Sequence, residues 1–396
     1  MAETVLFLAL FSLASWVYLC GLRGGFWRAD QRLAPDGGQT TGAHVVAIVP
    51  ARNEEAYVGR ALRALLAQKG VELHVVLVDD HSHDRTRAVA EALAAEAGGR
   101  LTVTGTAPLP GGWTGKLWAL EEGVRVAGRV DAHAEYLLLT DADVEIGPST
   151  LRRLLAKAGR ERLDLASLMV ELDHRGVWGR LLIPAFVFFF QKLYPFRWVA
   201  DLSKATAAAA GGCILVRRAA LERAGGVGAI RGALIDDCAL AAAVKRSGGR
   251  IWLGLADDAR SLRDNRRLSS IWDVVARTAY TQLNHAPTLL AGTLAGMMVT
   301  YLVPPLATLL WPLHGSAAAA AVGGAAWLLM MLCYRPTLRC YGQPTAAGTL
   351  LPLAGLLYSL MTASSAVRHW RGRGGHWKGR VYPTPVRSDS GEVRVE

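Results

Sequence analysis

Apolar stretches at both ends of the chain constrain its fold most strongly. Thr4–Leu22 is apolar over about the length of one bilayer crossing. It has no charged segment before it and no Ala-x-Ala cleavage site, which favours an anchor over a signal peptide that is removed. Further apolar stretches follow at Thr288–Trp311, Ala317–Tyr334 and Ala346–Val367. The sequence therefore predicts transmembrane segments at both ends and a globular part between them.

These stretches divide the chain into four predicted regions. They are a transmembrane anchor with a juxtamembrane segment (1–40), a globular domain (41–285), a transmembrane region (286–367) and a basic tail (368–396). Inside the globular domain, the apolar run Gly179–Phe190 contains Pro184 and has basic residues on both sides. It predicts a helix at about 179–198 that lies in the membrane interface, with an ordinary buried helix as the alternative.

Basic residues gather beside the apolar stretches and account for much of the net charge of +11. Arg23, Arg28 and Arg32 follow the first stretch, and Arg368, Arg371, Arg373, Lys378 and Arg380 follow the last. This distribution is typical of a membrane surface with anionic lipid and of cytosolic loops. A nucleic-acid-binding protein would interleave basic and aromatic residues on one soluble face, so we exclude that class.

The globular domain alternates strand and helix patterns. Apolar runs at His44–Pro50, Leu73–Val78, Arg100–Val103 and Tyr136–Leu139 are separated by helical patterns. This order predicts an α/β fold with a mostly parallel sheet, whose loops at the carboxyl edge form the functional site. The first strand is followed by Pro-Ala-Arg-Asn-Glu-Glu, without a Gly-x-Gly-x-x-Gly fingerprint, and no Walker A sequence occurs. The five cysteines lack metal-site spacing, and Cys213 and Cys238 are interpreted as small buried residues in a reducing compartment.

Asp141 and Asp143 are the leading candidates for a metal site. They end the run Leu137–Val144, where strand alternation would direct both carboxylates to one side. Paired carboxylates repel each other unless a cation lies between them, and Mg²⁺ or Mn²⁺ is held by a few such oxygens plus substrate phosphates. Harmless strand capping is the alternative.

Other polar residues follow the predicted strands. Asp79 and Asp80 could accept hydrogen bonds from a base or a ribose, although Asp80, Ser82 and Asp84 could equally cap the next helix. Lys116, after Gly111–Gly115, could neutralise a phosphate or remain a solvated lysine.

A glycine pair and a second acidic pair occur later in the domain. Gly211 and Gly212 would permit close approach of a substrate. Asp236 and Asp237 begin a predicted helix, where they are either capping residues or a general base kept ionised by the helix terminus.

Together these features resemble the family 2 glycosyltransferases, which have a GT-A fold. The resemblance covers roughly Val45–His285 and rests on ordered motifs at Val49–Glu55, Val78–Asp84, Trp113–Lys116, Thr140–Asp143, Gly211–Cys213 and Asp236–Asp237. The family usually has Glu-Asp at the last position, so Asp-Asp here leaves Asp237 aligned.

The resemblance implies a role for each matching residue. Glu54 and Asp79 would lie at the base and ribose of the nucleotide, Asp141 and Asp143 at the metal and diphosphate, and Asp237, beside Asp236, would be the catalytic base. The nucleotide-sugar site so implied comprises Pro50, Arg52, Glu54, Asp79, Lys116, Asp141, Gly212, Arg277, Gln282, Trp377 and Arg380, with Mg²⁺ or Mn²⁺ as cofactor.

The C-terminal motifs bear on the acceptor. Processive members carry Gln-x-x-Arg-Trp, whereas this chain has the same residue types in another order from Trp272 through Arg277 to Gln282. The motif Trp113–Lys116, together with the tail Trp377–Tyr382, looks closest to the hopene-associated glycosyltransferases and similar to carotenoid-glycosylating enzymes. This resemblance implies an isoprenoid lipid acceptor and hopanoid-type lipid glycosylation.

We therefore expect a multi-pass enzyme of the inner (cytoplasmic) membrane with a cytosolic catalytic domain. It would be an inverting enzyme that transfers a sugar from a nucleotide sugar, a UDP-sugar, to an isoprenoid lipid. A polyprenyl-phosphate glycosyltransferase, or an inactive membrane scaffold or transporter, are the alternatives. If the tail is cytosolic, one of the three C-terminal stretches cannot cross the membrane as a single helix. The best candidate is Thr288–Trp311, which Pro304-Pro305 interrupts and which could form a re-entrant or interfacial hairpin.

Overall fold

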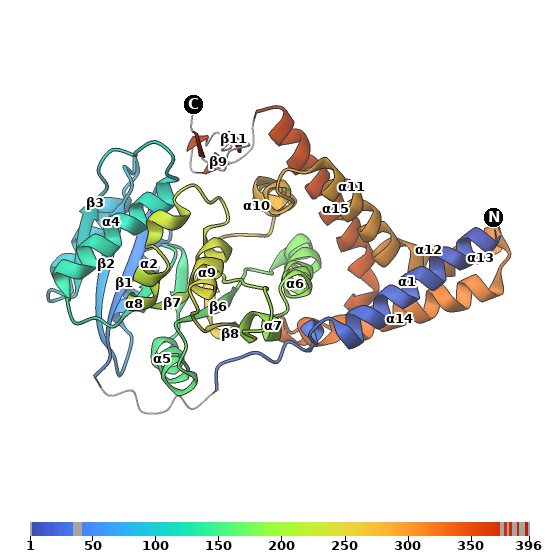
Figure 1. Ribbon diagram of the computed structural model, residues 1–396, viewed down its shortest axis with the longest axis horizontal. Coiled ribbons are helices and arrows are strands. Elements are labelled where there is room, and N and C mark those ends of the chain that lie inside the picture. Colours follow the sequence, from blue (N-terminus) through green and yellow to red (C-terminus); the bar gives the residue numbers. More distant parts are fainter. Residues whose placement is uncertain are drawn as a thin grey trace. The chain divides into compact units, whose positions relative to one another are not determined.

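A computed structural model describes residues 2–34 and 42–372, and the backbone of four two-residue strands beyond them. The chain forms two compact units. The first, called here the sheet unit, contains Asp30–Leu172 and Trp198–Arg263. The second, called here the helical unit, contains Met1–Ala29, Asp173–Arg197 and Asp264–His376. Figure 1 labels the helices and strands of both units.

The sheet unit is built on one eight-stranded sheet with the order β3-β2-β1-β4-β7-β6-β8-β5. Strands β3, β2, β1 and β4 are parallel to one another, as predicted from their apolar runs. Strand β7 is antiparallel to both of its neighbours, and β5 is antiparallel to β8. The strands are β1 (His44–Ala51), β2 (Glu72–Asp79), β3 (Leu101–Gly105), β4 (Tyr136–Leu139), β5 (Val144–Ile146), β6 (Leu165–Glu171), β7 (Ile214–Arg217) and β8 (Ile251–Ser261).

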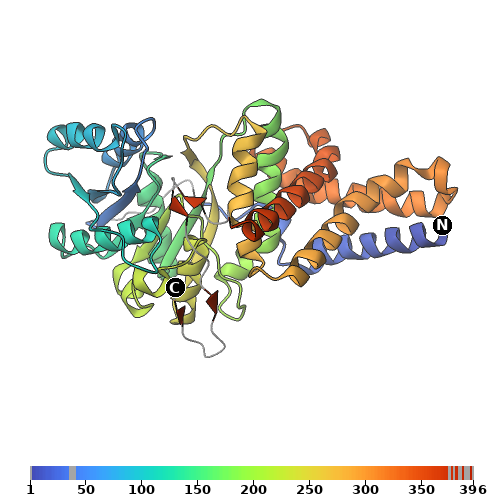
Figure 2. The ribbon, with the colours of Figure 1, turned by 90° about the horizontal axis from the view of Figure 1, so that it is seen from above.

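Helices cover both faces of this sheet (Figure 2). On one face, Val45, Val49 and Leu77 pack in a core that includes Leu62 of α2 and Leu93 of α3. On the other face, α4 lies so close that a Cβ at Gly123 would be 2.2 Å from Ile48 Cγ2. The helices of this unit are α2 (Val58–Leu66), α3 (Thr86–Glu96), α4 (Gly115–Val130), α5 (Thr150–Glu161), α7 (Phe196–Ala200), α8 (Arg218–Arg223) and α9 (Asp236–Arg246), with the 3₁₀ turn η2 (Val227–Ile230).

The expected GT-A-like α/β fold is confirmed, with one local correction at the acidic pair. Strand β4 ends at Leu139, so Asp141 and Asp143 do not lie on an extended strand. Asp141–Val144 form a turn, in which the Val144 amide donates a hydrogen bond to the Asp141 carbonyl at 3.2 Å. The carboxylates are therefore oriented by a turn and not by strand alternation.

The helical unit contains five helices that are long and apolar enough to cross a membrane, among the residues the structure describes. They are Ala2–Leu22, Gly176–Leu193, Pro287–Leu309, Ala317–Cys340 and Thr345–Trp370. Pro287–Leu309 is not one regular helix, since a π-helical turn at Met298–Leu302 interrupts it. The elements are α1 (Ala2–Leu22), η1 (Phe26–Arg28), α6 (Gly176–Leu193), α10 (Leu268–Gln282), α11 (Pro287–Met297), η3 (Met298–Leu302), α12 (Val303–Leu309), α13 (Trp311–His314), α14 (Ala317–Cys340), η4 (Thr345–Leu350) and α15 (Leu351–Trp370).

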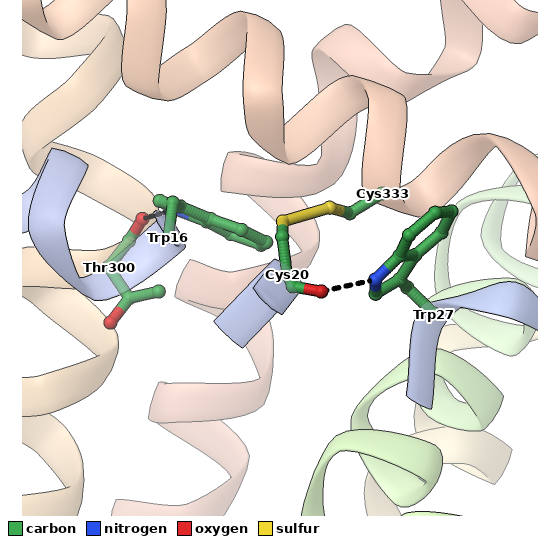
Figure 3. The surroundings of a disulfide bond; sticks show 5 residues. All are labelled: Trp16, Cys20, Trp27, Thr300 and Cys333. Atoms are coloured by element: carbon green, nitrogen blue, oxygen red, sulfur yellow. Dashed lines mark hydrogen bonds between the residues drawn. A yellow bond between two sulfur atoms is a disulfide. The ribbon is translucent and has the colours of Figure 1, made fainter. Parts of the chain in front are cut away.

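A disulfide between Cys20 and Cys333 joins α1 to α14 (Figure 3). Two tryptophans flank it. The Trp16 indole donates to the Thr300 carbonyl in the π-helical turn at 2.8 Å, and the Trp27 indole donates to the Cys20 carbonyl at 2.9 Å. The spacing of the cysteines gave no indication of this pair. Cys213 and Cys238 are buried, as expected, and neither of them is part of a disulfide.

Helix α6 occupies the segment predicted to lie in the membrane interface. Its aromatic residues pack inside the helical unit, where Phe188 contacts Tyr334 and Phe189 contacts Tyr301 and Tyr358. The strands before and after it, β6 and β7, pair directly with each other. The chain before α6 and the chain after it therefore belong to the same sheet, so α6 cannot cross the membrane once. It meets the criteria of length and composition for a membrane span without being one.

Candidate active site

Residues at the ends of β1, β2 and β4 meet the starts of α4 and α9 within the sheet unit. Pro50, Lys116, Asp141, Asp236 and Asp237 line one cavity, together with Gly211 and apolar side chains. These predicted site residues come from distant parts of the sequence, so the fold brings them together. Their functional roles stay predictions.

Lys116 is the shared counter-ion of the acidic residues in this cavity. Its Nζ lies 2.9 Å from Asp141 Oδ1 and 3.1 Å from Asp236 Oδ2. Thr114 begins α4 as its N-cap, with its side chain accepting from the Leu117 amide, and this fixes the helix turn that carries Lys116. Lys116 is therefore neither a solvated lysine nor free to bind a phosphate alone.

The pKa values reflect this crowding of charge. Burial alone would lower the pKa of Lys116, but the negative charges of Asp141 and Asp236 raise it, so the amine stays protonated. Burial raises the pKa of Asp141 despite the attraction of Lys116. Burial and the neighbouring charge of Asp236 raise the pKa of Asp237 to about 6. Asp237 is thus a carboxyl group that titrates close to neutral pH.

Two backbone amides hold the Asp237 carboxylate. The Gly211 amide donates to Oδ2 at 2.9 Å and the Cys238 amide donates to Oδ1 at 2.7 Å. Asp237 therefore sits in the first turn of α9, as the helix-start prediction requires.

The loops after β1 and β2 are linked by backbone-to-side-chain hydrogen bonds. The Asn53 amide donates to Ser82 Oγ at 3.0 Å, the Glu54 amide to Thr86 Oγ1 at 2.7 Å and the Glu55 amide to Asp84 Oδ2 at 3.1 Å. Asp84 Oδ1 also accepts from the Thr86 amide at 2.9 Å, at the start of α3. Asp84 thus has the helix-start role that the sequence left open, whereas Ser82 links the two loops.

Asp79 is a buried acid at the end of β2. Its side chain is 6% exposed, and its Oδ1 has no hydrogen-bond partner within the part of the chain that the structure describes. A buried, unpaired carboxylate oxygen is costly unless a ligand donates to it. Arg52 is turned toward the same loop, where its Nη1 donates to the carbonyl of Asp80.

Arg263 is a site residue that the sequence did not indicate. Its Nε lies 2.5 Å from Asp143 Oδ2 and its Nη2 lies 2.5 Å from Glu54 Oε1. Antiparallel pairing of Val144 with Ser261 brings the end of β8 beside the Asp141–Asp143 turn. Only this tertiary pairing could have revealed the contact, since Arg263 is one of several arginines in its segment.

Gly211 and Gly212 lie in different surroundings. A Cβ on Gly211 would lie 3.3 Å from Lys116 Nζ and 3.5 Å from Asp237 Oδ2. A Cβ on Gly212 would lie 2.9 Å from Val170 Cγ2, in the core. Gly211, and not Gly212, is therefore the glycine that faces the charged side chains.

Alanine at each glycine should separate these two roles. We expect Gly211→Ala to lower turnover by about tenfold to a hundredfold, because Lys116 and Asp237 must shift, with little loss of stability. We expect Gly212→Ala to destabilise the fold by about 1–3 kcal/mol through overpacking. Thermal unfolding and initial rates of the two variants would check this, and equal effects on both quantities would contradict the assignment.

The remaining predicted residues lie elsewhere. Arg277 and Gln282 are on α10 in the helical unit. Trp377 and Arg380 belong to the short strands β9 (His376–Trp377) and β10 (Arg380–Val381), whose side chains are outside the described residues. Trp113, the first residue of the motif Trp113–Lys116, packs against Trp118 with ring centroids 5.1 Å apart.

A divalent cation would find two carboxylates at the turn after β4. Among the described residues, no group of three or more His, Cys, Asp or Glu side chains could hold a metal ion. Two carboxylates suit Mg²⁺ or Mn²⁺ when phosphate oxygens of a substrate complete the coordination. The oxygen donors of Asp141 and Asp143 therefore fit such an ion.

Comparison with known proteins identifies the family. The family model described as glycosyltransferase-like family 2 matches residues 43–280. The chain belongs to this family. The matched glycosyltransferase region contains all of the cavity residues above, together with α6 and most of α10.

One curated protein is similar to part of the chain. The succinoglycan biosynthesis protein ExoO of Rhizobium meliloti (strain 1021) is 32% identical over 133 residues, which are 34% of this chain and 33% of that protein. The chain thus matches about a third of the length of this curated relative.

A solved structure with a TM-score above 0.5 has the same fold. Mannosyltransferase PcManGT from Pyrobaculum calidifontis, in complex with GDP-Man and Mn²⁺, has a TM-score of 0.54 and 18% identity, covering 91% of this chain and 99% of that chain. TarS from S. aureus in complex with UDP has a TM-score of 0.39 and 17% identity, covering 72% of this chain and 90% of that chain.

Proposed function

We propose that this glycosyltransferase transfers a sugar, with inversion, from a nucleotide sugar to a lipid alcohol, with the help of Mg²⁺ or Mn²⁺. The observation that carries the proposal is the cavity around Gly211, where Lys116 is shared by Asp141 and Asp236, and Asp237 adjoins them. A family 2 glycosyltransferase needs a diphosphate-binding edge and a base on opposite sides of the sugar. Asp141 and Asp237 line this cavity from different elements and supply both.

The donor would bind at the ends of β1, β2 and β4. Asp79 Oδ1, buried and without a partner among the described residues, is suited to accept a hydrogen bond from the nucleoside. Asp141 and Asp143 would hold the divalent cation, which offsets the charge that develops on the leaving diphosphate. PcManGT was solved with GDP-Man and Mn²⁺, which supports this class of donor and ion.

Asp237 would act as the general base. The two amides from Gly211 and Cys238 fix the orientation of its carboxylate. A pKa of about 6 leaves it ionised at neutral pH and still able to accept a proton from an alcohol as the alcohol attacks the sugar. The alcohol would attack the face of the sugar opposite the leaving diphosphate, so the anomeric configuration would be inverted.

The acceptor would be an isoprenoid lipid delivered from the membrane. Support comes from the candidate membrane helices that the same chain carries. Two arms of one experiment identify the acceptor. Purified full-length protein in lipid vesicles is given a panel of UDP- and GDP-sugars with Mn²⁺, and either a hopanoid or carotenoid alcohol or a polyprenyl phosphate.

Lipid mass spectrometry then reads the product. A glycosylated lipid alcohol supports the proposal. Glycosylation of the polyprenyl phosphate alone would overturn the assignment of the acceptor, and the absence of any Mn²⁺-dependent turnover or donor hydrolysis would favour an inactive scaffold.

We further propose that the catalytic domain and the tail lie on the cytosolic side of the inner membrane, and that α15 does not cross singly. The ring of Tyr341, before α15, lies 5.1 Å from that of His174, and Gln343 donates to the Arg180 carbonyl at 3.4 Å. At the other end, Arg368 pairs with Asp273 of α10 at 2.8 Å. The segment before η4 and the C-terminal end of α15 thus contact parts of the helical unit that are directly connected in sequence to the sheet unit.

An exposed apolar stripe on α15 also suits a helix in the membrane plane. Leu353, Leu356, Leu360 and Val367 are exposed at helical spacing. These contacts favour α15 over Thr288–Trp311 as the stretch that does not cross singly.

Single-cysteine labelling tests this topology. We expect Leu313→Cys, between α12 and α14, to react with an impermeant reagent in intact cells. We expect Ser388→Cys, in the tail outside the described residues, to react only after the cells are opened. Labelling of Ser388→Cys in intact cells would mean three single crossings and a tail remote from the catalytic domain.

A further inference from the structure

Arg263 is the counter-ion of two buried carboxylates. The side chains of Glu54 and Asp143 are each 8% exposed, whereas that of Arg263 is 42% exposed. Its Nε and Nη2 each contact one carboxylate at 2.5 Å, so one guanidinium bridges the loop after β1 and the turn after β4. The nearby backbone strengthens this contact, because the Leu262 amide donates to the Asp143 carbonyl at 2.7 Å.

The guanidinium remains charged in this position. Burial would lower the pKa of Arg263, but the charges of Asp143 and Glu54 raise it. Its Nε contacts Oδ2 of Asp143, one of the two acids that would hold the divalent cation. Two cations on one carboxylate oxygen repel each other strongly in a site with little water. Metal binding at Asp143 and the present Arg263 contact are therefore in competition.

A released guanidinium would have a new partner in the same place. Arginine presents a planar fork of donors that matches phosphate oxygens. The donor diphosphate would lie at the metal, within reach of a side chain that starts from the end of β8.

We propose that Arg263 is a displaceable counter-ion of the donor site. It neutralises Asp143 and Glu54 before substrate binds, leaves Asp143 when a divalent cation binds there, and then binds the donor diphosphate. This inference rests on the proposed function. It predicts that metal and nucleotide bind cooperatively, since each favours the position of Arg263 that the other requires.

A purely structural ion pair would behave differently. In that case Arg263 would only fasten β8 to the loops, and its loss would lower stability without improving the affinity for a metal ion. The matched control is Arg260, which lies on β8 three residues before Arg263 and pairs with Glu145 at 2.7 Å. Arg260→Gln removes the same charge without touching the site.

Calorimetry on the full-length protein in detergent measures the effect. Without nucleotide, we expect Arg263→Gln to bind Mn²⁺ at least about fivefold more tightly than the wild type. With saturating Mn²⁺, we expect it to bind UDP or GDP at least about fivefold more weakly. Arg260→Gln should match the wild type in both titrations. Arg263→Lys keeps one charge but cannot bridge two carboxylates. We therefore expect its affinities for Mn²⁺ and for nucleotide to lie between those of the wild type and Arg263→Gln. It replaces Arg263→Gln in the experiment if that variant does not fold.

Two results would overturn the inference in distinguishable ways. Unchanged or weaker Mn²⁺ binding in Arg263→Gln, or an equal gain in Arg260→Gln, refutes the displaceable counter-ion while leaving the metal site intact. If neither wild type nor variant binds Mn²⁺ even with UDP or GDP present, the metal site of the proposed function fails as well.

Discussion

Asp237→Asn is expected to lower kcat by about 10²–10⁴-fold, the usual contribution of a positioned general base. The substitution preserves the shape of the side chain and loses one of its two acceptor positions for the Gly211 and Cys238 amides. Binding of UDP or GDP with Mn²⁺, measured by calorimetry, should change little, because the acids assigned to the metal are Asp141 and Asp143. If binding and turnover fall together, Asp237 holds the nucleotide and is not the base.

The pH dependence of the same reaction gives a second measurement. Only ionised Asp237 can accept a proton, so we expect kcat to fall tenfold per pH unit below about pH 6. The charge of Asp236 contributes to the raised pKa of Asp237. Asp236→Asn should therefore move this acid limb to lower pH, whereas Asp237→Asn should abolish it. A limb that stays in place in Asp237→Asn belongs to another group.

The sheet and its order of elements followed well from local sequence patterns. The run His44–Pro50 has apolar residues that are buried on both faces of β1, and such runs encode buried parallel strands directly. The mixed half of the sheet was less accessible, because the direction of β7 and β8 depends on pairing between distant segments. Local pattern also overextended the strand before Asp141, where the chain turns.

Some residues of the candidate site could likewise be predicted from local sequence, and others could not. Asp141, Asp143 and Asp237 stand at strand or helix ends, and a motif could mark them. No motif marks the positions of Arg263 and Gly211 beside the charged side chains, because these positions depend on contacts between distant segments of the folded chain. The Cys20–Cys333 pair is of the same kind, because it depends on α1 lying beside α14.

Asp143→Ala is expected to lower transfer by at least about a thousandfold, since the loss of several kcal/mol of charge stabilisation from the metal corresponds to that factor. Asp143 is 5% exposed, and its carboxylate is one of only two at the turn after β4. Without it, a divalent cation would be left with Asp141, whose charge is already shared with Lys116. Mn²⁺ binding should be lost in parallel with transfer, both measured on the same preparation.

The fold should survive this substitution, because Arg263 keeps its contact with Glu54. Cooperative thermal unfolding would confirm that, and Asp143→Asn, which leaves no cavity, should lose transfer to a similar extent. Glu145→Gln is the matched control, since Glu145 lies on the adjoining strand β5 and pairs with Arg60 and Arg260 away from the cavity. Normal transfer with unchanged metal dependence in Asp143→Ala would refute the assignment of the metal to this turn, because the other nearby carboxylates, Asp141 and Glu145, are already paired with basic side chains.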